Sequence, residues 1–382
     1  MSALTELRAS LRRILAIAHK EVLHVVRDPR SLYLALGMPI VLLVIFGFGV
    51  SFDMEHLPVA VIDEDRSELS RSFIARVFAS GELELIDVPN LDATHASGVF
   101  ERREAIGVLI VPQGFGENVS RGRAETVQLL LDGVDPNTAT QTLAKADAVV
   151  RAAGAVMTRG ASSAPMRMPI DMRVRTWFNP QSRSALFLVP GLTAYILAIV
   201  SVLLTSLTLA REFERGSMQQ LFATPVARFE IVIGKLLPYL GLGAVAVLMV
   251  LTAGAWVFDV PVRGSIAALA LSSLLFLIGM LAQGLLVSII ARTQMVATQM
   301  ATMTSMLPSM LLSGFMFPIE NMPLPLRVIS NVVPARYYIH ALRGILLRGN
   351  TLAEVAPDLL ALSIFAIVVL TISTVRFPRT LA

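Results

Sequence analysis

Cysteine is absent from this 382-residue chain, so disulfides, thiol catalysis and cysteine metal sites are excluded. Lysine is scarce, occurring only at Lys20, Lys145 and Lys235, and charged residues make up 16% of the chain against 55% for hydrophobic ones. A composition this apolar, with a positive mean hydropathy, is typical of an integral membrane protein and excludes a soluble globular one.

Ionisable side chains are missing from the apolar segments that we expect to cross the membrane. These six segments are residues 31–52, 186–210, 236–257, 266–290, 295–317 and 359–375. Ion-driven carriers place charged groups at membrane depth, which argues against that class. The nucleotide-binding pattern G-x-x-x-x-G-K-[ST] is also absent, so energy for uphill transport would have to come from a separate subunit.

The predicted topology starts with a basic amphipathic helix over residues 1–30, which we expect to lie on the inner membrane surface. Its apolar positions recur at helical spacing and are Leu11, Ile14, Leu15, Ala18, Val22 and Val25. Its basic residues keep the N-terminus in the cytoplasm by the positive-inside rule, and six spans return the C-terminus there. We therefore expect a multi-pass protein of the bacterial inner membrane, with residues 186–382 forming the second to sixth spans.

Residues 53–185 have the composition of a soluble domain and would lie on the periplasmic side. Strand patterns at 57–63, 82–88, 107–111 and 126–131 alternate with helical patterns at 67–79, 94–104 and 137–157, and another strand is expected near 172–178. This alternation predicts an inserted extracytoplasmic α/β domain with a mixed sheet. Asp63, Glu64 and Asp65 follow the first strand and could hold a divalent ion, although acids in a turn are more often solvated. We expect no metal there.

A charged segment at residues 211–235, REFERGSMQQLFATPVARFEIVIGK, separates two predicted spans. Ser217 and Gln220 form a capping-box pattern that predicts a short helix, and Thr224 with Pro225 predicts the start of the next one. A short amphipathic helix at the membrane face would suit the docking of a soluble partner. The alternative is an ordinary capped turn with solvated charges.

Two further stretches carry possible functions. Residues 334–349, PARYYIHALRGILLRG, would place Arg336, His340 and Arg343 on one helix face and apolar residues on the other, which predicts an interfacial or re-entrant outer helix. The methionines of the fifth span could line a path for apolar solutes, with packing between helices as their more common role. The candidates for that path are Met303, Met306 and Met310.

The chain resembles the membrane subunits of bacterial ABC-2 type transporters that carry a large outer domain between the first two spans. The resemblance rests on KEVLHVVRDPR, FNPQSRSALFLVPG, REFERGSMQQLFATPV and ARYYIHALRGILLRG. It implies a six-helix ABC-2 exporter fold and a coupling helix that docks on an ATP-binding subunit. The residues to which it assigns coupling are Glu212, Glu214, Arg215, Gly216, Leu221, Thr224 and Pro225.

The function that we expect is that of a permease subunit exporting a hydrophobic or amphipathic, drug-like compound. The chain would not be an enzyme and would bind no cofactor, because ATP belongs to the partner subunit. Its other expected partners are a second permease copy or paralogue, possible periplasmic adaptors and the membrane, without nucleic acid. The alternative is a non-transporting membrane anchor whose outer domain senses or tethers a partner.

Overall fold

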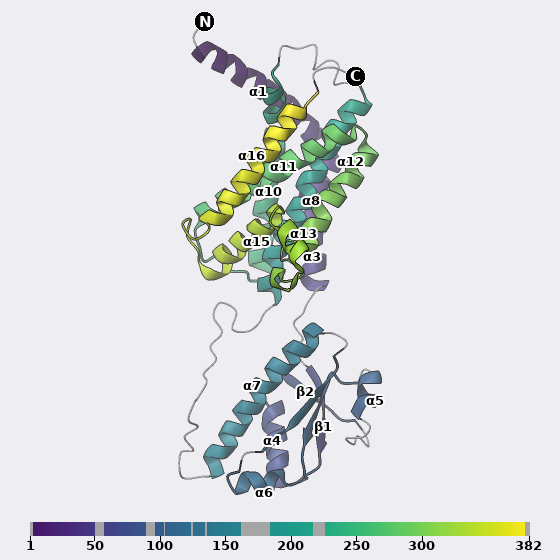
Figure 1. Ribbon diagram of the computed structural model, residues 1–382, viewed down its shortest axis with the longest axis vertical. Coiled ribbons are helices and arrows are strands. Elements are labelled where there is room, and N and C mark those ends of the chain that lie inside the picture. The colour runs from purple at the N-terminus through teal and green to yellow at the C-terminus, as the bar shows by residue number, and fades with distance from the viewer. Residues whose placement is uncertain are drawn as a thin grey trace. The chain divides into compact units, whose positions relative to one another are not determined.

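The chain folds into two units, of which one comprises Met1–Ser51 with Thr176–Ala382 and the other Phe52–Arg175 (Figure 1). The computed structural model describes residues 3–49, 57–88, 96–102, 104–123, 125–133, 136–161, 184–216 and 226–378.

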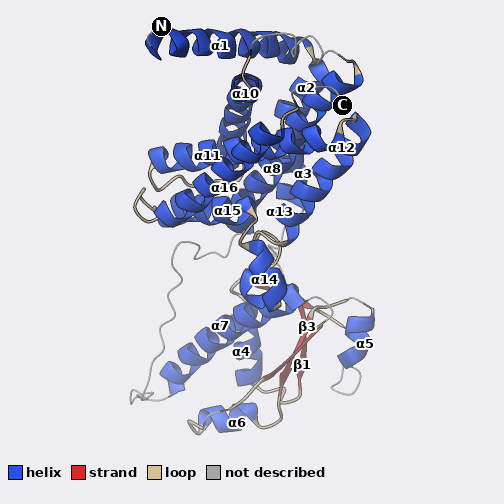
Figure 2. Ribbon diagram, turned by 45° about the horizontal axis from the view of Figure 1, so that its top comes forward, coloured by secondary structure: helices blue, strands red, loops and turns tan. Residues whose placement is uncertain are grey.

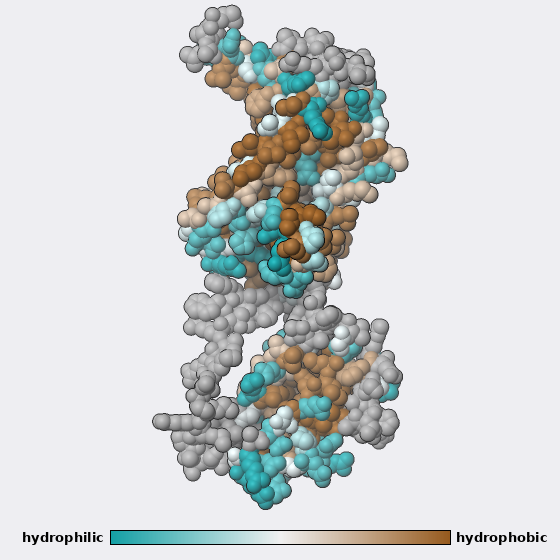
Figure 3. Space-filling view, viewed as in Figure 1, coloured by the Kyte–Doolittle hydropathy of each residue, from teal (hydrophilic) through white to brown (hydrophobic). Residues whose placement is uncertain are grey.

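Long apolar helices form the first unit. They are α8 (Ser184–Glu214), α10 (Arg228–Val257), α11 (Ile266–Ala291) and α16 (Ala356–Arg376), and among the described residues these four are long and apolar enough to cross a bilayer. α8 is apolar around its circumference and buried along nearly its whole length. α16 instead exposes a row of large apolar side chains, visible as a continuous hydrophobic band (Figure 3). That band is the kind of surface that lipid would cover.

The N-terminal part is helical but interrupted. Helix α1 (Ala3–Arg27) is interrupted at Asp28. α2 (Pro29–Leu32) then leads through a π-helical turn, η1 (Tyr33–Gly37), into α3 (Met38–Gly49). The predicted first span, residues 31–52, thus corresponds to an apolar helix that is shorter than the other four in its described part.

The fifth predicted span, residues 295–317, has to be corrected at its C-terminal end. Helix α12 (Gln294–Ala301) continues through the π-helical turn η2 (Thr302–Met306) into α13 (Leu307–Leu311) and stops there. Pro308 has no backbone N–H for the carbonyl of Thr304, and the side chain of Gln283 donates to that carbonyl instead, at 3.0 Å. Gly314 then adopts a φ of +80°, which ends the helical path before Phe317.

The segment after this break contains a 3₁₀ turn, η3 (Ile319–Asn321), two short helices, α14 (Leu324–Ser330) and α15 (Pro334–Arg343), and a π-helical turn, η4 (Gly344–Arg348). The apolar face expected for residues 334–349 is buried, with Ile339, Leu342, Ile345 and Leu346 at 0–1% exposure. Gly349, with a φ of +84°, closes the helical stretch. Whether this helix is interfacial or re-entrant stays a prediction.

The second unit has a four-stranded sheet in the order β2-β1-β3-β4. Its elements are β1 (Leu57–Asp63), α4 (Glu68–Phe78), β2 (Leu83–Ile86), α5 (Ala96–Glu101), β3 (Gly107–Val111), α6 (Phe115–Ser120), β4 (Gln128–Leu131) and α7 (Pro136–Ala161). β1 pairs in parallel with β2 and β3, and β4 runs antiparallel to β3, so the sheet is mixed. One apolar cluster lies on each face of the sheet, and the larger includes residues of α4 and α7. The strand expected near residues 172–178 lies outside the described residues.

Candidate coupling site

The charged segment between α8 and α10 is shorter than the predicted coupling loop of residues 211–235. α8 continues to Glu214 and α10 begins at Arg228, because the Glu230 carboxylate accepts the Ala227 backbone N–H at 3.0 Å and satisfies a donor at the start of α10. Gly216 has a φ of +69°, a left-handed conformation that suits the end of α8. Leu221, Thr224 and Pro225 lie outside the described residues.

Glu212, on the last turn of α8, points into a cluster of buried charges. Lys235 Nζ donates to Glu212 Oε2 at 2.6 Å and to Glu21 Oε1 at 2.7 Å, and the Lys235 side chain is only 4% exposed. Lys20 Nζ adds a longer bond to Glu212 at 3.3 Å. Since Glu21 and Lys20 belong to α1 and Lys235 to α10, these ion pairs join three helices at one point.

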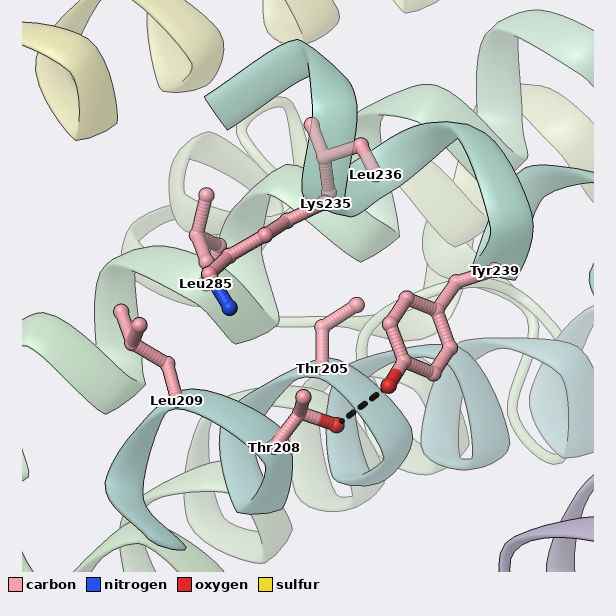
Figure 4. Close-up of a pocket in the computed structure, with 7 residues that line it drawn as sticks. All are labelled: Thr205, Thr208, Leu209, Lys235, Leu236, Tyr239 and Leu285. Carbon is pink, nitrogen blue, oxygen red and sulfur yellow. Dashed lines mark hydrogen bonds between the residues drawn. The ribbon is translucent and has the colours of Figure 1, made fainter. Parts of the chain in front are cut away.

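A small cavity adjoins Lys235 between α8, α10 and α11 (Figure 4). Its volume of about 10 Å³ leaves room for one water molecule. Thr208 donates to the Tyr239 hydroxyl at 2.9 Å on the wall of the cavity, and Thr205 reaches the Leu281 carbonyl of α11 at the same distance. The cavity is far too small for a drug-sized cargo, and the hydrogen bonds along it connect α8 with α10 and α11.

Two further ion pairs attach α1 and its end to the same region. Arg13 forms two hydrogen bonds with the Glu230 carboxylate, at 2.8 Å and 2.6 Å, in the bidentate geometry that arginine favours. Arg211, one turn before the end of α8, donates to Asp28 at 2.9 Å, where α1 meets α2. The Arg13–Glu230 pair therefore attaches α1 to α10, and the Arg211–Asp28 pair attaches the residue after α1 to α8.

Glu214 connects the end of α8 to α12. Its carboxylate accepts the backbone N–H of Gln294 at 2.7 Å and also the Gln294 side chain. Arg215 and Gly216 follow directly, and Arg215 is exposed. Of the predicted coupling residues that the structure describes, Glu212 and Glu214 thus have partners within the chain, and Arg215 is exposed.

Sequence analysis did not identify the partners of these residues. The bonded partners lie far apart in sequence: 214 residues separate Glu21 from Lys235, 217 separate Arg13 from Glu230, and 80 separate Glu214 from Gln294, so no local pattern pairs them. One signal was present: Lys235 is one of only three lysines and directly precedes an apolar run. A lone lysine at that position suggests a buried partner.

The methionines proposed for a path lie on the interrupted helix α12–α13. Met303 is exposed, whereas Met306 and Met310 are partly buried. The hydroxyls of Thr302, Thr304 and Ser305 bond to carbonyls one turn earlier in the helix. This surface is therefore apolar with internally satisfied polar groups.

Two of the three acids considered for a metal ion, Asp63 and Asp65, have structural roles in the second unit. Asp65 accepts the backbone N–H groups of Gly114 and Gly116 at 2.8 Å and 3.0 Å, and Asp63 accepts the Ser70 hydroxyl at 2.7 Å. Hydrogen bonding by Ser67 and these backbone groups lowers the pKa of Asp65. Within the described residues, no three His, Asp or Glu side chains gather as metal ligands would.

Comparison with known proteins identifies the family. Residues 30–375 match the model of the ABC-2 family transporter proteins. The probable multidrug ABC transporter permease YbhS of Escherichia coli is 34% identical over 97% of this chain and 98% of its own length, and the related permease YbhR is 27% identical over 95% and 96%. The linearmycin resistance permease protein LnrN of Bacillus subtilis is 20% identical over 90% and 94%. The chain belongs to the ABC-2 transporter family and is a helical, multi-pass membrane protein of that family.

Proposed function

We propose that this chain is the permease subunit of an ATP-driven exporter in the bacterial inner membrane. A separate nucleotide-binding subunit hydrolyses ATP, and the permease moves a hydrophobic or amphipathic, drug-like compound outward. The permease names of its relatives support this role, and two of them are named as probable multidrug permeases. The permease acts as a pair with a second copy or a paralogue, and a periplasmic adaptor is a further possible partner.

The proposed arrangement in the membrane follows the sequence. Six helices span the bilayer, both termini lie in the cytoplasm, and the α/β unit lies on the periplasmic side. The basic N-terminal segment supports this orientation through the positive-inside rule. The chain itself is not an enzyme and holds no cofactor or metal.

The observation that carries the proposal is the cluster of ion pairs beside the segment between α8 and α10. Glu212 and Glu214 connect the end of α8 to α1, α10 and α12. A displacement of this segment by the ATP-binding subunit would move α1, α8 and α10 together, since buried ion pairs resist separation. The hydrogen bonds between Glu214 and Gln294 would transmit the movement to α12. The helices would then shift as near-rigid bodies and change which side of the membrane the path faces.

The proposed path runs between two copies of the permease along the surface with Met303, Met306 and Met310. Methionine side chains are flexible and polarizable, so one surface adapts to differently shaped apolar compounds. Packing of the two copies against each other through the same residues is the alternative. Replacing all three by leucine would lower export of some cargoes and spare others if they line a path, and would leave the cargo range unchanged if they only pack.

Co-purification with the ATP-binding subunit tests the proposal. The variants are Arg215→Glu and Leu221→Asp. The control is Arg121→Glu in the α/β unit, because Arg121 is exposed and its ion pair is with Glu117, one helical turn earlier. Both variants should lose the subunit or its permease-dependent ATPase activity, and the control should keep both. Full association and activity in both variants would exclude this docking role.

The α/β unit supports a second candidate, a non-transporting membrane anchor that senses or tethers a partner. The unit has apolar clusters on both sheet faces, as an independently folding domain would. The anchor hypothesis predicts that changes at Arg215 and Leu221 leave function intact. If the unit instead guides cargo in an exporter, replacing residues 53–184 with a linker should reduce export.

A further inference from the structure

Helix α1 lies across the end of α10 (Figure 2), and its surface divides into three faces. The first face is buried against α10 and includes Ile17, Ala18, Glu21 and Val25. A Cβ atom on Gly234 of α10 would lie 2.8 Å from the Cβ of Ile17 and 3.1 Å from the carbonyl oxygen of Ile14. The two backbones therefore approach as closely as a glycine permits, and α1 is fixed in orientation.

The second face of α1 is apolar and exposed. Its side chains recur at intervals of four and seven residues, so they form one stripe along the helix. They are Leu7, Leu11, Leu15, Val22 and Val26, and between 42% and 69% of each is exposed. A soluble helix of this composition would bury such a stripe, so a second apolar surface has to cover it.

The third face is cationic. Arg8 and Arg12 are exposed beside the apolar stripe, and Arg27 is exposed at the C-terminal end of α1. Within the described part of the chain, these three arginines form no ion pair. By contrast, Arg13 and Lys20, on the side toward the bundle, are paired with Glu230 and Glu212. Arg13 and Lys20 therefore have structural partners, whereas Arg8, Arg12 and Arg27 are exposed without such partners among the described residues.

We propose that α1 binds anionic phospholipids of the inner leaflet, with its apolar stripe inserted among the acyl chains and Arg8, Arg12 and Arg27 on the headgroup phosphates. A helix that lies across the end of a membrane-spanning helix is at the depth of the headgroups. There its apolar stripe can contact the acyl chains while its arginines contact the phosphates. Arginine also forms two parallel hydrogen bonds with a phosphate group, which strengthen the attraction between the opposite charges.

The position of α1 gives this lipid binding a consequence for transport. Glu21 and Lys20 of α1 contact Lys235 and Glu212, so lipid that holds α1 in place also holds the end of α8. This consequence rests on the proposed coupling function, whereas the lipid binding itself does not.

Lipid selectivity of the purified full chain tests the proposal. The chain is exposed to an equimolar mixture of phosphatidylglycerol and phosphatidylcholine in detergent, and the bound lipids are counted by native mass spectrometry. The test variant combines Arg8→Gln, Arg12→Gln and Arg27→Gln, and a second variant replaces the same residues with lysine. The matched control removes three exposed arginines of the α/β unit, Arg71→Gln, Arg76→Gln and Arg121→Gln.

The wild type, the lysine variant and the control should prefer phosphatidylglycerol, and the glutamine variant should lose preference by about fivefold for each arginine removed. Equal preference in the wild type and the glutamine variant would overturn the proposal. It would also be overturned if the glutamine variant kept the lipid but lost the ATP-binding subunit, because this face would then be a protein-docking surface. A failure of the coupling proposal alone would leave the lipid result unchanged.

Discussion

Removal of the Lys235 amino group should destabilise the helical unit strongly. In Lys235→Met the carboxylates of Glu21 and Glu212 lose a shared partner that lies 2.7 Å and 2.6 Å away, and the Glu21 side chain is only 2% exposed. Breaking a buried ion pair by removing one partner costs about 3–5 kcal/mol. For a unit of this size that loss corresponds to a fall in the thermal midpoint on the order of 10 °C.

A triple variant separates stability from coupling. Replacing Glu21, Glu212 and Lys235 together by methionine removes the buried charges, and apolar replacement of a whole buried ion cluster is often neutral or stabilising by about 1–4 kcal/mol. The triple variant should therefore regain a thermal midpoint near that of the wild type, yet still show reduced permease-dependent ATPase activity, because the ion pairs of Lys235 with Glu21 and Glu212 no longer join α1, α8 and α10 at one point.

Thermal midpoints are measured by fluorescence-detected size exclusion after heating, and ATPase rates on the complex with the nucleotide-binding subunit. An unchanged midpoint in Lys235→Met would refute the argument from buried charge. Recovery of both the midpoint and full activity in the triple variant would show that the cluster only stabilises the fold.

Three other changes test separate contacts. Gly234→Ala should displace α1 from α10 and expose it to protease, whereas Gly241→Ala on the same helix, where the added Cβ meets open space, should not. Gly284→Val should prevent α8 from packing on α11 and lower the yield of folded protein, since its Cβ would lie 2.1 Å from the Thr205 hydroxyl, and normal yield would contradict this. The hydrogen bond to Asp358, 2.7 Å long, raises the pKa of His340, so its stabilising effect is complete below about pH 6.5 and is lost as the pH rises through the raised value. His340→Gln should accordingly flatten the dependence of the thermal midpoint on pH between about pH 6.5 and the raised pKa, and an unchanged profile would show that the pair contributes nothing.

The sequence predicted the elements whose pattern is local. The strand at residues 57–63 coincides with β1, and the helix expected at 67–79 is α4, because alternation, length and the Ser67 cap are all readable within one short segment. The apolar positions of the N-terminal helix were also recognised, yet the division between its buried and exposed faces was not. Ile17 and Glu21 turn toward α10, whereas Leu11 and Leu15 are exposed.

The candidate site could be located from sequence but its internal connections could not. The charged residues between two apolar runs indicated a membrane-face segment, and resemblance assigned coupling to Glu212 and Glu214. The pairing of Lys235 with Glu21, 214 residues away, depends on how three helices pack and leaves no periodic signal. The fifth span was predicted six residues too long for a different reason: the apolar residues continue to Phe317, past the end of α13 at Leu311, so hydropathy and length do not show where the helix stops.

The central claim is that a soluble ATP-binding subunit docks at the segment that follows α8. The chain has no native cysteine, so Arg215→Cys introduces a single thiol at an exposed position beside this segment. The measurement is the rate of maleimide labelling of that thiol in the purified permease, with and without the ATP-binding subunit, and Arg121→Cys serves as the control. The account predicts that the subunit slows labelling of Arg215→Cys and leaves Arg121→Cys unchanged; equal labelling of Arg215→Cys in the free and bound permease would contradict it.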